Sequence, residues 1–331
     1  MTSDDDQDAP PPHPRPGASF FTIEGRAAPG LFVVGWLASL LGAGFLVVGA
    51  VAGSPLFALF LGPGLLSLGL IAGAGNQALE RRARGEAYAG PSPFIVFAAI
   101  VFVTRFVAVL LGPLLVMTFG NRADAPDPVR QLVGALLTAV IFIGMVRLLV
   151  VGTGALTWAE MRVRRIDRRA MSDLLAGAAL ALPTVGVTLI LGLVLVSIFR
   201  VVSPSPLPPT GTTSGLILQL IAAAIVAPIS EEILFRGFAV TAWERAIGPM
   251  RAIVRASLLF ALAHVLDTRG ASFGEALAVI AVGAGSRLPV AFALGWIFVQ
   301  RRSIWASIGL HATFNATLLL VADLAVRAGA G

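Results

Sequence analysis

Few residues in this chain could do acid–base chemistry inside a membrane, and they are concentrated near its carboxy-terminal end. Two adjacent glutamates, Glu231 and Glu232, lie within an otherwise apolar segment, and Arg236 follows four residues after the second. His264 and His311 lie in two further apolar segments. A carboxylate and an imidazole together can remove a proton from a water molecule as it attacks a carbonyl group. These residue types therefore favour hydrolysis by an activated water.

The spacing of the first group gives the two glutamates different surroundings on a helix. Glu232 and Arg236 are four residues apart with the acid first, which is the favourable order for an ion pair on one helix face. Glu231 points about 100° away around the helix and lacks this partner. Such a difference in surroundings allows one glutamate to act as the acid–base residue while the other supports it. The alternative is that all three residues form a structural cluster at the membrane interface.

Each histidine has a polar or aromatic neighbour one helical turn away. Phe260 precedes His264 by four residues, and Asn315 follows His311 by four, so each pair shares a helix face. His311 and Asn315 could together donate hydrogen bonds to a developing oxyanion. Taken separately, each histidine also fits a simpler role, which is a hydrogen bond between packed membrane helices.

Distances along the chain place these residues at one depth in the membrane. An arginine of a flanking basic loop lies 14 residues along the chain from Glu231, 13 from His264 and 9 from His311. At about 1.5 Å per residue these are depths of roughly 13–21 Å, all measured from the same side. Three helices can therefore bring the polar side chains to one level, a coincidence that packing alone does not require.

The elements that must position these residues are membrane helices. The chain of 331 residues is 57% apolar and 13% charged, with a mean hydropathy of +0.88, whereas soluble domains contain about 25% charged residues. The composition predicts an all-α polytopic membrane protein. The absence of cysteine excludes disulfides, thiol catalysis and cysteine-ligated metals.

Hydrophobic segments predict a bundle of about eight or nine transmembrane helices with a polar intramembrane cavity. Nine stretches qualify by composition: 31–53, 56–74, 94–119, 132–157, 174–200, 215–238, 252–266, 276–299 and 303–325. The second and seventh are short or interrupted for a span of about 20 residues. The eighth contains glycines, Arg287 and Pro289, which predicts a bent or partly re-entrant element. Residues 31–203 form the amino-terminal helices in this scheme, and 215–325 the catalytic core.

The distribution of arginine predicts the orientation in the membrane. All 24 basic residues are arginine, and they cluster in alternate connections, at 81–84, 162–169, 245–251 and 301–302. The intervening connections carry few, such as Arg122, Arg130 and Arg269. The positive-inside rule then places the basic loops and the amino terminus in the cytoplasm, in a multi-pass protein of the cell (inner) membrane. This pattern argues against a nucleic-acid partner, and residues 1–30, rich in aspartate and proline, predict a disordered cytoplasmic tail.

Three motifs in order resemble those of a known family of membrane proteases. Glu231-Glu232 with Arg236, Phe260 with His264, and His311 with Asn315 match the patterns EExxxR, FxxxH and HxxxN. The chain is thereby similar to the CPBP family, the type II CAAX prenyl and bacteriocin-processing (Abi) intramembrane glutamate proteases. The resemblance covers about residues 215–325, and the segment GWIFVQRRSIWASIGLHATFN before the last motif is also similar.

The resemblance implies an intramembrane endopeptidase with a cavity open to the cytoplasmic side or to the membrane. Glu231 would activate water with help from His264, and His311 and Asn315 would stabilise the oxyanion. Glu232 and Arg236 would hold the motif helix in place. The expected partners are a peptide or membrane-associated protein substrate and membrane lipid. No cofactor is expected.

Two other functions use the same residues. One is a zinc-dependent membrane protease, because two histidines and a glutamate are known zinc ligands, although the helical HExxH pattern is absent. The other is a non-catalytic membrane protein of the same family type, acting in bacteriocin self-immunity or as a scaffold. A transporter is disfavoured because the sequence shows no inverted repeat.

Overall fold

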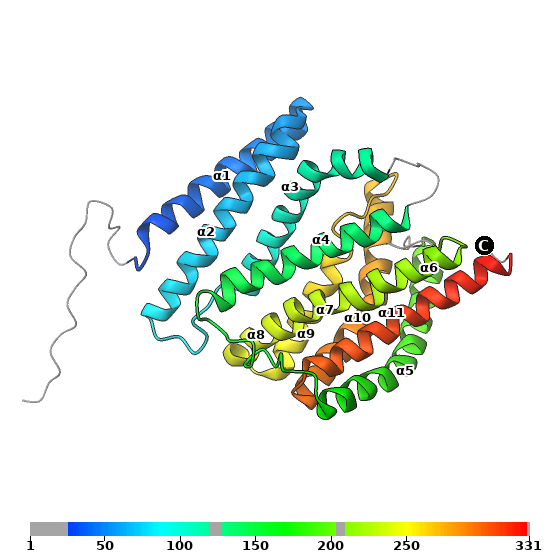
Figure 1. The fold of residues 1–331 in the computed structure, drawn as a ribbon. Coiled ribbons are helices and arrows are strands. Elements are labelled where there is room, and N and C mark those ends of the chain that lie inside the picture. The colour runs from blue at the N-terminus through cyan, green and yellow to red at the C-terminus, as the bar shows by residue number, and fades with distance from the viewer. Residues whose placement is uncertain (1–25, 120–126, 203–208, 330–331) are drawn as a thin grey trace, which may run out of the picture.

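The computed structural model of this chain describes residues 26–119, 127–202 and 209–329, and all the regular elements in these ranges are helical (Figure 1). The predicted disordered tail lies outside the described residues, apart from its last few positions. The helices are α1 (Pro29–Ala52), η1 (Leu56–Leu61), α2 (Gly62–Ala83), α3 (Pro93–Phe119), α4 (Pro128–Val146), η2 (Arg147–Val151), α5 (Arg168–Phe199), α6 (Thr213–Leu220), η3 (Ile221–Val226), α7 (Ala227–Glu232), η4 (Ile233–Val240), α8 (Thr241–Ile247), α9 (Pro249–Ala263), α10 (Phe273–Arg301) and α11 (Ile304–Arg327).

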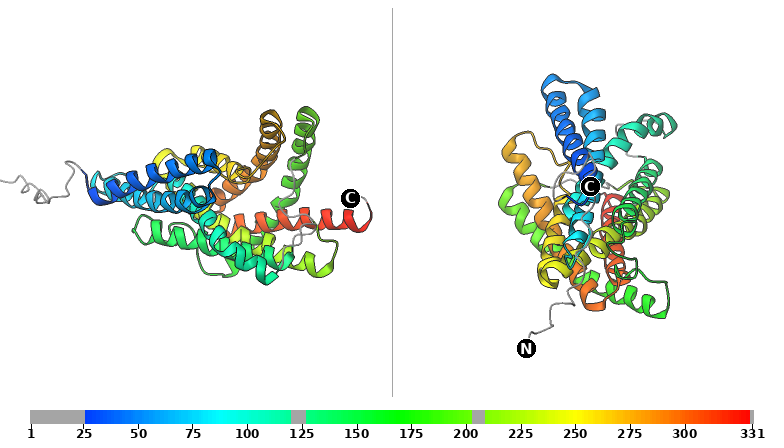
Figure 2. Two further views of the ribbon diagram at one scale, coloured as in Figure 1. Left: turned by 90° about the horizontal axis from the view of Figure 1, so that it is seen from above. Right: turned by 90° about the vertical axis from the view of Figure 1, so that its left-hand side faces the viewer.

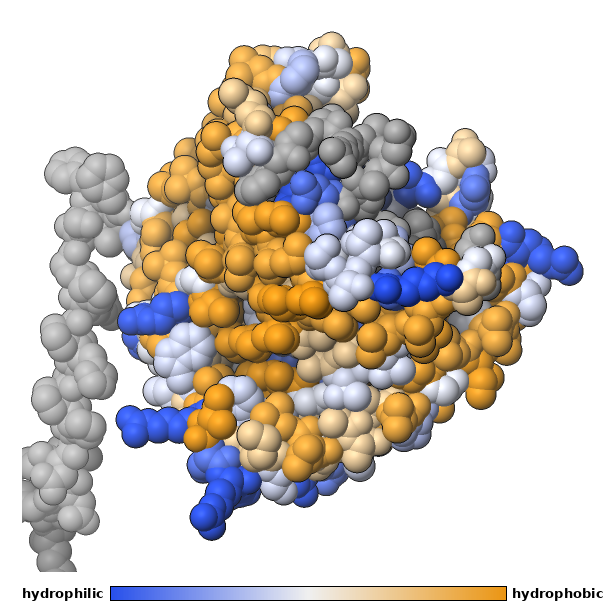
Figure 3. Space-filling model, turned by 45° about the vertical axis from the view of Figure 1, so that its right-hand side comes forward, coloured by the Kyte–Doolittle hydropathy of each residue, from blue (hydrophilic) through white to orange (hydrophobic). Residues whose placement is uncertain are grey.

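Eight helical stretches in the described ranges are long and apolar enough to cross a membrane. They carry many exposed apolar side chains, such as Leu193, which is 72% exposed, and large hydrophobic areas cover the face seen in Figure 3. The chain is therefore an all-α, multi-pass membrane protein, as predicted. The seventh hydrophobic stretch is not among the eight, because α9 has 15 residues and spanning needs about 20.

Helix α10 corresponds to the eighth hydrophobic stretch, for which a bent or a partly re-entrant element was predicted. It runs without interruption for 29 residues from Phe273 to Arg301, so the re-entrant alternative is wrong. Pro289 lies inside it, where proline removes one backbone hydrogen bond and bends a helix without ending it.

The packing arranges a hairpin beside a bundle. Helices α1 and α2 pair along their lengths at one edge, and α3 joins them to the rest (Figures 1 and 2). In the bundle, α11 packs against α5, α7 and α10, while α4 packs against α6 and α7. The arginine-rich ends of the bundle helices, where α8, α10 and η2 end, lie together at the lower left of Figure 1, and the chain's carboxy-terminal end lies at the opposite side.

Two glycines allow α5 and α11 to approach backbone to backbone. A Cβ atom at Gly177 would lie 2.0 Å from the carbonyl oxygen of Ala306, and one at Gly309 would lie 2.2 Å from that of Leu174. Small residues permit such contacts between membrane helices. Since Gly309 is two residues before His311, this contact also fixes the position of the histidine.

We expect Gly309→Ala to push α5 and α11 apart and to destabilise the protein by about 1–3 kcal/mol, the usual cost of overpacking. Gly186→Ala, also in α5, is the matched control, because a Cβ there meets nothing within 4 Å. The control gains helix propensity and should be neutral or stabilising. Thermal unfolding of both variants in detergent measures the difference, and equal melting temperatures would contradict the close approach.

The helix that carries the two glutamates is unusually wound. From Thr213 to Ile247 the chain is continuously helical, but Ile221–Val226 and Ile233–Val240 form π-helical turns on either side of Ala227–Glu232. Wide turns of this kind occur frequently at functional sites. They set the direction in which the side chains of α7 point, and the hydrophobic pattern gave no sign of them.

The connection at 152–167 closes the arginine-rich end of the bundle. Arg162 donates to Glu244 at 2.6 Å and to the carbonyl oxygen of Phe298 at 3.0 Å. The indole of Trp305 donates to the carbonyl oxygen of Arg164 at 3.0 Å. Glu160 accepts a hydrogen bond from Arg245 at 2.7 Å. These contacts attach the connection to α8, α10 and α11.

The Glu160 contact should make stability depend on pH. Hydrogen bonds from Arg245, and then from Thr157, lower the pKa of this carboxyl from 4.5 to about 2. The stabilisation is therefore complete above about pH 4.5 and is lost as the pH falls toward 2. Because the side chain is 42% exposed, we expect it to contribute no more than about 1 kcal/mol. The melting temperatures of the wild type and Glu160→Gln should differ at pH 7 and converge only as the pH approaches 2; a constant difference would contradict this assignment.

Candidate active site

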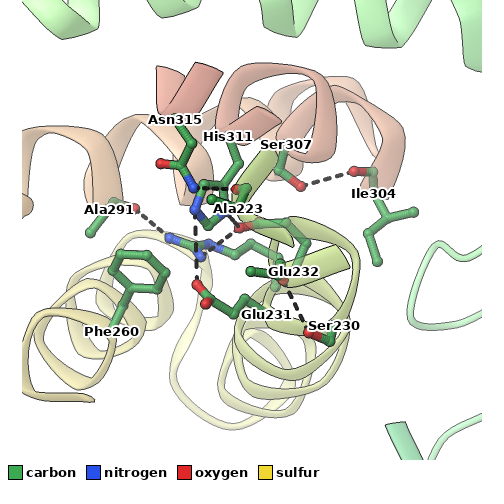
Figure 4. Close-up of polar contacts among 12 residues, drawn as sticks. Ala223, Ser230, Glu231, Glu232, Phe260, Ala291, Ile304, Ser307, His311 and Asn315 are labelled. Carbon is green, nitrogen blue, oxygen red and sulfur yellow. Dashed lines mark hydrogen bonds and ion pairs between the residues drawn. The ribbon is translucent and has the colours of Figure 1, made fainter. Parts of the chain in front are cut away.

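Glu231 lies on the wall of a cavity of about 550 Å³ between six helical segments. The cavity is walled by parts of α4, α5, α9, α10, α11 and the helix from η3 to α7. Its lining residues include Glu231, His264, His311 and Asn315, together with Phe260. The structure thus brings to one cavity four residues that are 84 positions apart at their extremes, and Figure 4 shows several of them.

Glu232 points away from the cavity into the protein. Its Oε1 accepts a hydrogen bond from Nη1 of Arg236 at 2.9 Å, and both side chains are 0% exposed. The ion pair predicted from the four-residue spacing is therefore present. Arg236 also donates from Nη2 to the carbonyl oxygen of Ala291 on α10, at 3.1 Å. The pair joins the motif helix to α10.

His311 is held by the same glutamate. Its Nδ1 lies 2.7 Å from Oε1 of Glu232. Because that carboxylate is paired with Arg236, the proton of this hydrogen bond belongs on Nδ1 of the imidazole. The other ring nitrogen, Nε2, then faces Glu231, and Nε2 of His311 lies 3.8 Å from Oε2 of Glu231. Glu232 thereby fixes the orientation of His311 as well as that of Arg236.

His264 is positioned by the end of its own helix. Helix α9 ends at Ala263, so the last carbonyl groups lack helical partners. Nδ1 of His264 lies 2.8 Å from the carbonyl oxygen of Phe260, to which it donates, and the two rings are 4.4 Å apart. The predicted neighbour Phe260 therefore acts through its backbone oxygen and through its ring. Nε2 of His264 is left facing Glu231, 3.9 Å from Oε2.

Glu231 is thus flanked by two imidazole nitrogens at nearly equal distances. Its Oε2 is buried and has no hydrogen-bond partner among the described residues. Separations of 3.8 and 3.9 Å are too long for direct hydrogen bonds but suit one water molecule shared among the three groups. The side chains of Glu231 and His264 remain 20% and 27% exposed to the cavity.

Asn315 lies on the same wall one turn after His311. Its Nδ2 donates to the carbonyl oxygen of Ala223 at 2.8 Å, across to the π-helical segment η3. A side-chain amide carries two protons on this nitrogen, so the second one is available to a group in the cavity. The spacing of His311 and Asn315 predicted a shared face, and both residues line the cavity.

Some contributors to the site were not expected from the sequence. The carbonyl groups of Ala223 and Ala291 accept the hydrogen bonds of Asn315 and Arg236, and nothing in the identity of an alanine signals such a role. Arg287 also lines the cavity and donates to the carbonyl oxygen of Gly283 at 2.6 Å. Its place inside a membrane helix allowed either a snorkelling or a cavity-lining position, and the second is the one observed.

The zinc alternative needs three suitably spaced ligands. In the part of the chain that the structure describes, no group of three histidine, aspartate or glutamate side chains has the arrangement of a metal site. The Nε2 atoms of His264 and His311 nevertheless face the same carboxylate. A chelator therefore distinguishes the zinc alternative from a glutamate-activated water.

Comparisons with known proteins agree with the motifs. Residues 213–317 match the family model described as type II CAAX prenyl endopeptidase Rce1-like, whereas no curated protein and no solved structure matches the chain. The matched segment begins at the first residue of α6 and ends in α11, and it contains all three motifs. The resemblance predicted from the three motifs is therefore confirmed over residues 213–317, where the chain is similar to the Rce1-like type II CAAX prenyl endopeptidases of the CPBP family.

Proposed function

We propose that this protein is an intramembrane endopeptidase in which Glu231 activates the water that cleaves a peptide bond. The observation that carries the proposal is the buried, unpartnered Oε2 of Glu231, placed 3.9 and 3.8 Å from the Nε2 atoms of His264 and His311. A water molecule in this space would donate its protons to Glu231 and to the lone pair of His264. No cofactor is required.

In the proposed reaction, the water oxygen attacks the carbonyl carbon of the scissile bond while Glu231 takes a proton from it. The carbonyl oxygen becomes an oxyanion in a tetrahedral intermediate. When the carbon–nitrogen bond breaks, Glu231 returns the proton to the leaving amine. The products are a carboxylic acid and an amine, and the carboxylate of Glu231 is restored.

His311 and Asn315 are the proposed donors to the oxyanion. Asn315 has its second amide proton for this purpose. Since Nδ1–H of His311 is directed to Glu232, Nε2 donates to the oxyanion when it too carries a proton. Donors fixed in advance around a developing charge give a large part of the rate enhancement in such enzymes.

The proposed substrate is a peptide or a membrane-associated protein, and the proposed location is the cell (inner) membrane with the amino terminus in the cytoplasm. The family match supports a membrane protease at the level of class. The distribution of arginine supports the orientation.

Incubation of the purified protein with a library of peptides, followed by mass spectrometry, tests the activity. We expect cleavage by the wild type and loss of cleavage with His264→Ala, because the water then lacks one of its acceptors. Equal cleavage by both proteins would end the assignment.

Chelation separates the proposed mechanism from the zinc alternative. Cleavage by a glutamate-activated water should be unchanged by 1,10-phenanthroline. Loss of activity with the chelator, restored by added zinc, would instead favour a metal bound by Glu231, His264 and His311. A protein that cleaves no peptide while its deletion changes the cell's resistance to a bacteriocin would favour the non-catalytic role.

A further inference from the structure

The cavity has a direction relative to the ends of the helices. From His311 it extends along α11 to Ala322, a distance of about 16 Å. Ala322 is five residues, or about 8 Å, from Arg327 at the end of α11. Gln131, also on the wall, is three residues after the first residue of α4. Both residues are near the helix ends that carry few arginines, which we call the arginine-poor face.

In the opposite direction the protein is filled. Every residue of Ile233–Val240, which follows Glu231 toward the arginine-rich end, is buried. Large side chains that are 0–1% exposed occupy this region: Phe235, Phe238, Phe298, Ile304 and Met161. The connection at 152–167 covers them through the contacts of Arg162 and Trp305. A second cavity of about 420 Å³ lies near the arginine-rich loops, beside Tyr88 and Trp243, but it shares no lining residue with the first. These described elements therefore give no continuous space from Glu231 to the arginine-rich loops.

Two helices shape the wall on the arginine-poor side. Helices α5 and α10 contain Pro183 and Pro289, and the part of α5 after Pro183 lies beside the part of α10 before Pro289. Figure 2 (left) shows these parts of α5 and α10 projecting together away from α11. Thr188, Ser286 and Arg287 on this pair line the cavity opposite α4 and α11. The cavity thus occupies the wedge between the two groups of helices.

We infer that the substrate reaches Glu231 from the arginine-poor face, through the wedge between the α5–α10 pair and helices α4 and α11. The positive-inside rule makes this face the non-cytoplasmic one. The substrate class that follows is an extended peptide segment exposed on the non-cytoplasmic side, such as a membrane-proximal segment of an exported protein. This inference rests on the proposed function in one respect, because it takes the molecule that enters the cavity to be a substrate. The route itself is a property of the cavity. It differs from an opening to the cytoplasmic side, which is one of the two openings, to the cytoplasmic side or to the membrane, that the family resemblance implied.

Because the chain has no cysteine, single cysteines can test the route without other changes. We select Ala322, Ala135 and Ala227, which line the cavity from its outer part to the turn before Glu231. Ala271 in the arginine-poor connection and Ala87 in an arginine-rich one are exposed and report the two sides. Ala239, which is 1% exposed, is the control for a buried thiol. The probe is a charged, membrane-impermeant methanethiosulfonate, applied to intact cells or to inverted vesicles.

We expect Ala322→Cys, Ala135→Cys and Ala227→Cys to react from the same side as Ala271→Cys, with rates that fall with depth, while Ala87→Cys reacts from the other side. Reaction of the cavity cysteines from the side of Ala87→Cys would overturn the inference. The inference would also be overturned if the cavity cysteines reacted from neither side, at rates as low as that of Ala239→Cys. Repeating the labelling in a Glu231→Gln background separates the two proposals, since the route requires no catalysis and the pattern should be unchanged even if no peptide is ever cleaved.

Discussion

Glu231→Gln is expected to lower the rate of peptide hydrolysis by about 10²–10⁴-fold, the range usual for a lost general base. Glutamine keeps the shape of the side chain but cannot accept the proton from the attacking water. The initial rate of cleavage of a peptide identified with the wild-type protein measures the effect. Full activity in this variant would assign the base to another group.

The same substitution should leave the stability unchanged or slightly increased. Oε2 of Glu231 has no hydrogen-bond partner among the described residues, so glutamine removes no protein contact there and relieves a charge held in a membrane cavity. Groups that serve catalysis are often unfavourable for folding. A melting temperature equal to that of the wild type would show that the lost activity does not come from unfolding.

Glu232→Gln, one residue later, should have the opposite effect on stability. It leaves the guanidinium of Arg236, which is 0% exposed, without its counter-charge, and breaking a buried pair in this way costs about 3–5 kcal/mol. It also weakens the contact to Nδ1 of His311. Denaturant titration in mixed micelles should show the loss, whereas the neighbouring Glu231→Gln serves as the control of identical chemistry.

A double variant distinguishes charge from shape in this result. In Glu232→Gln/Arg236→Met no unpaired charge remains, so much of the lost stability should return. If the double variant is as unstable as Glu232→Gln, the instability comes instead from packing or from the lost support of His311. Activity should stay low in both variants because His311 is no longer held.

The sequence predicted the parts of the site that depend on spacing within one helix. The pairing of Glu232 with Arg236 and the shared face of His311 and Asn315 follow from a separation of four residues, which any α-helix turns into neighbours. The membrane composition also predicted the fold class, because apolar stretches of sufficient length have few alternatives in a bilayer.

Contacts between helices could not be predicted in the same way. The hydrogen bond of His311 to Glu232 joins residues 79 positions apart, and that of Asn315 uses a backbone oxygen that every residue possesses. The π-helical turns around α7 depend on packing against neighbouring helices, not on a residue type. Likewise Gln131 and Thr188 reach the cavity from helices outside the segment of family resemblance, and their sequence neighbours gave no reason to connect them with Glu231.

The short helix α9 has a consequence for how the protein is made. With 15 residues it is about 22 Å long, less than the roughly 30 Å of the hydrocarbon layer, and cannot be expected to remain in the bilayer alone. During synthesis it would have to enter together with α10, which packs against it and is translated after it. His264, at the end of α9, therefore meets Glu231 only once α10 has been inserted as well, and His311 and Asn315 join them with α11. A nascent chain would then lack the assembled site until it is almost complete.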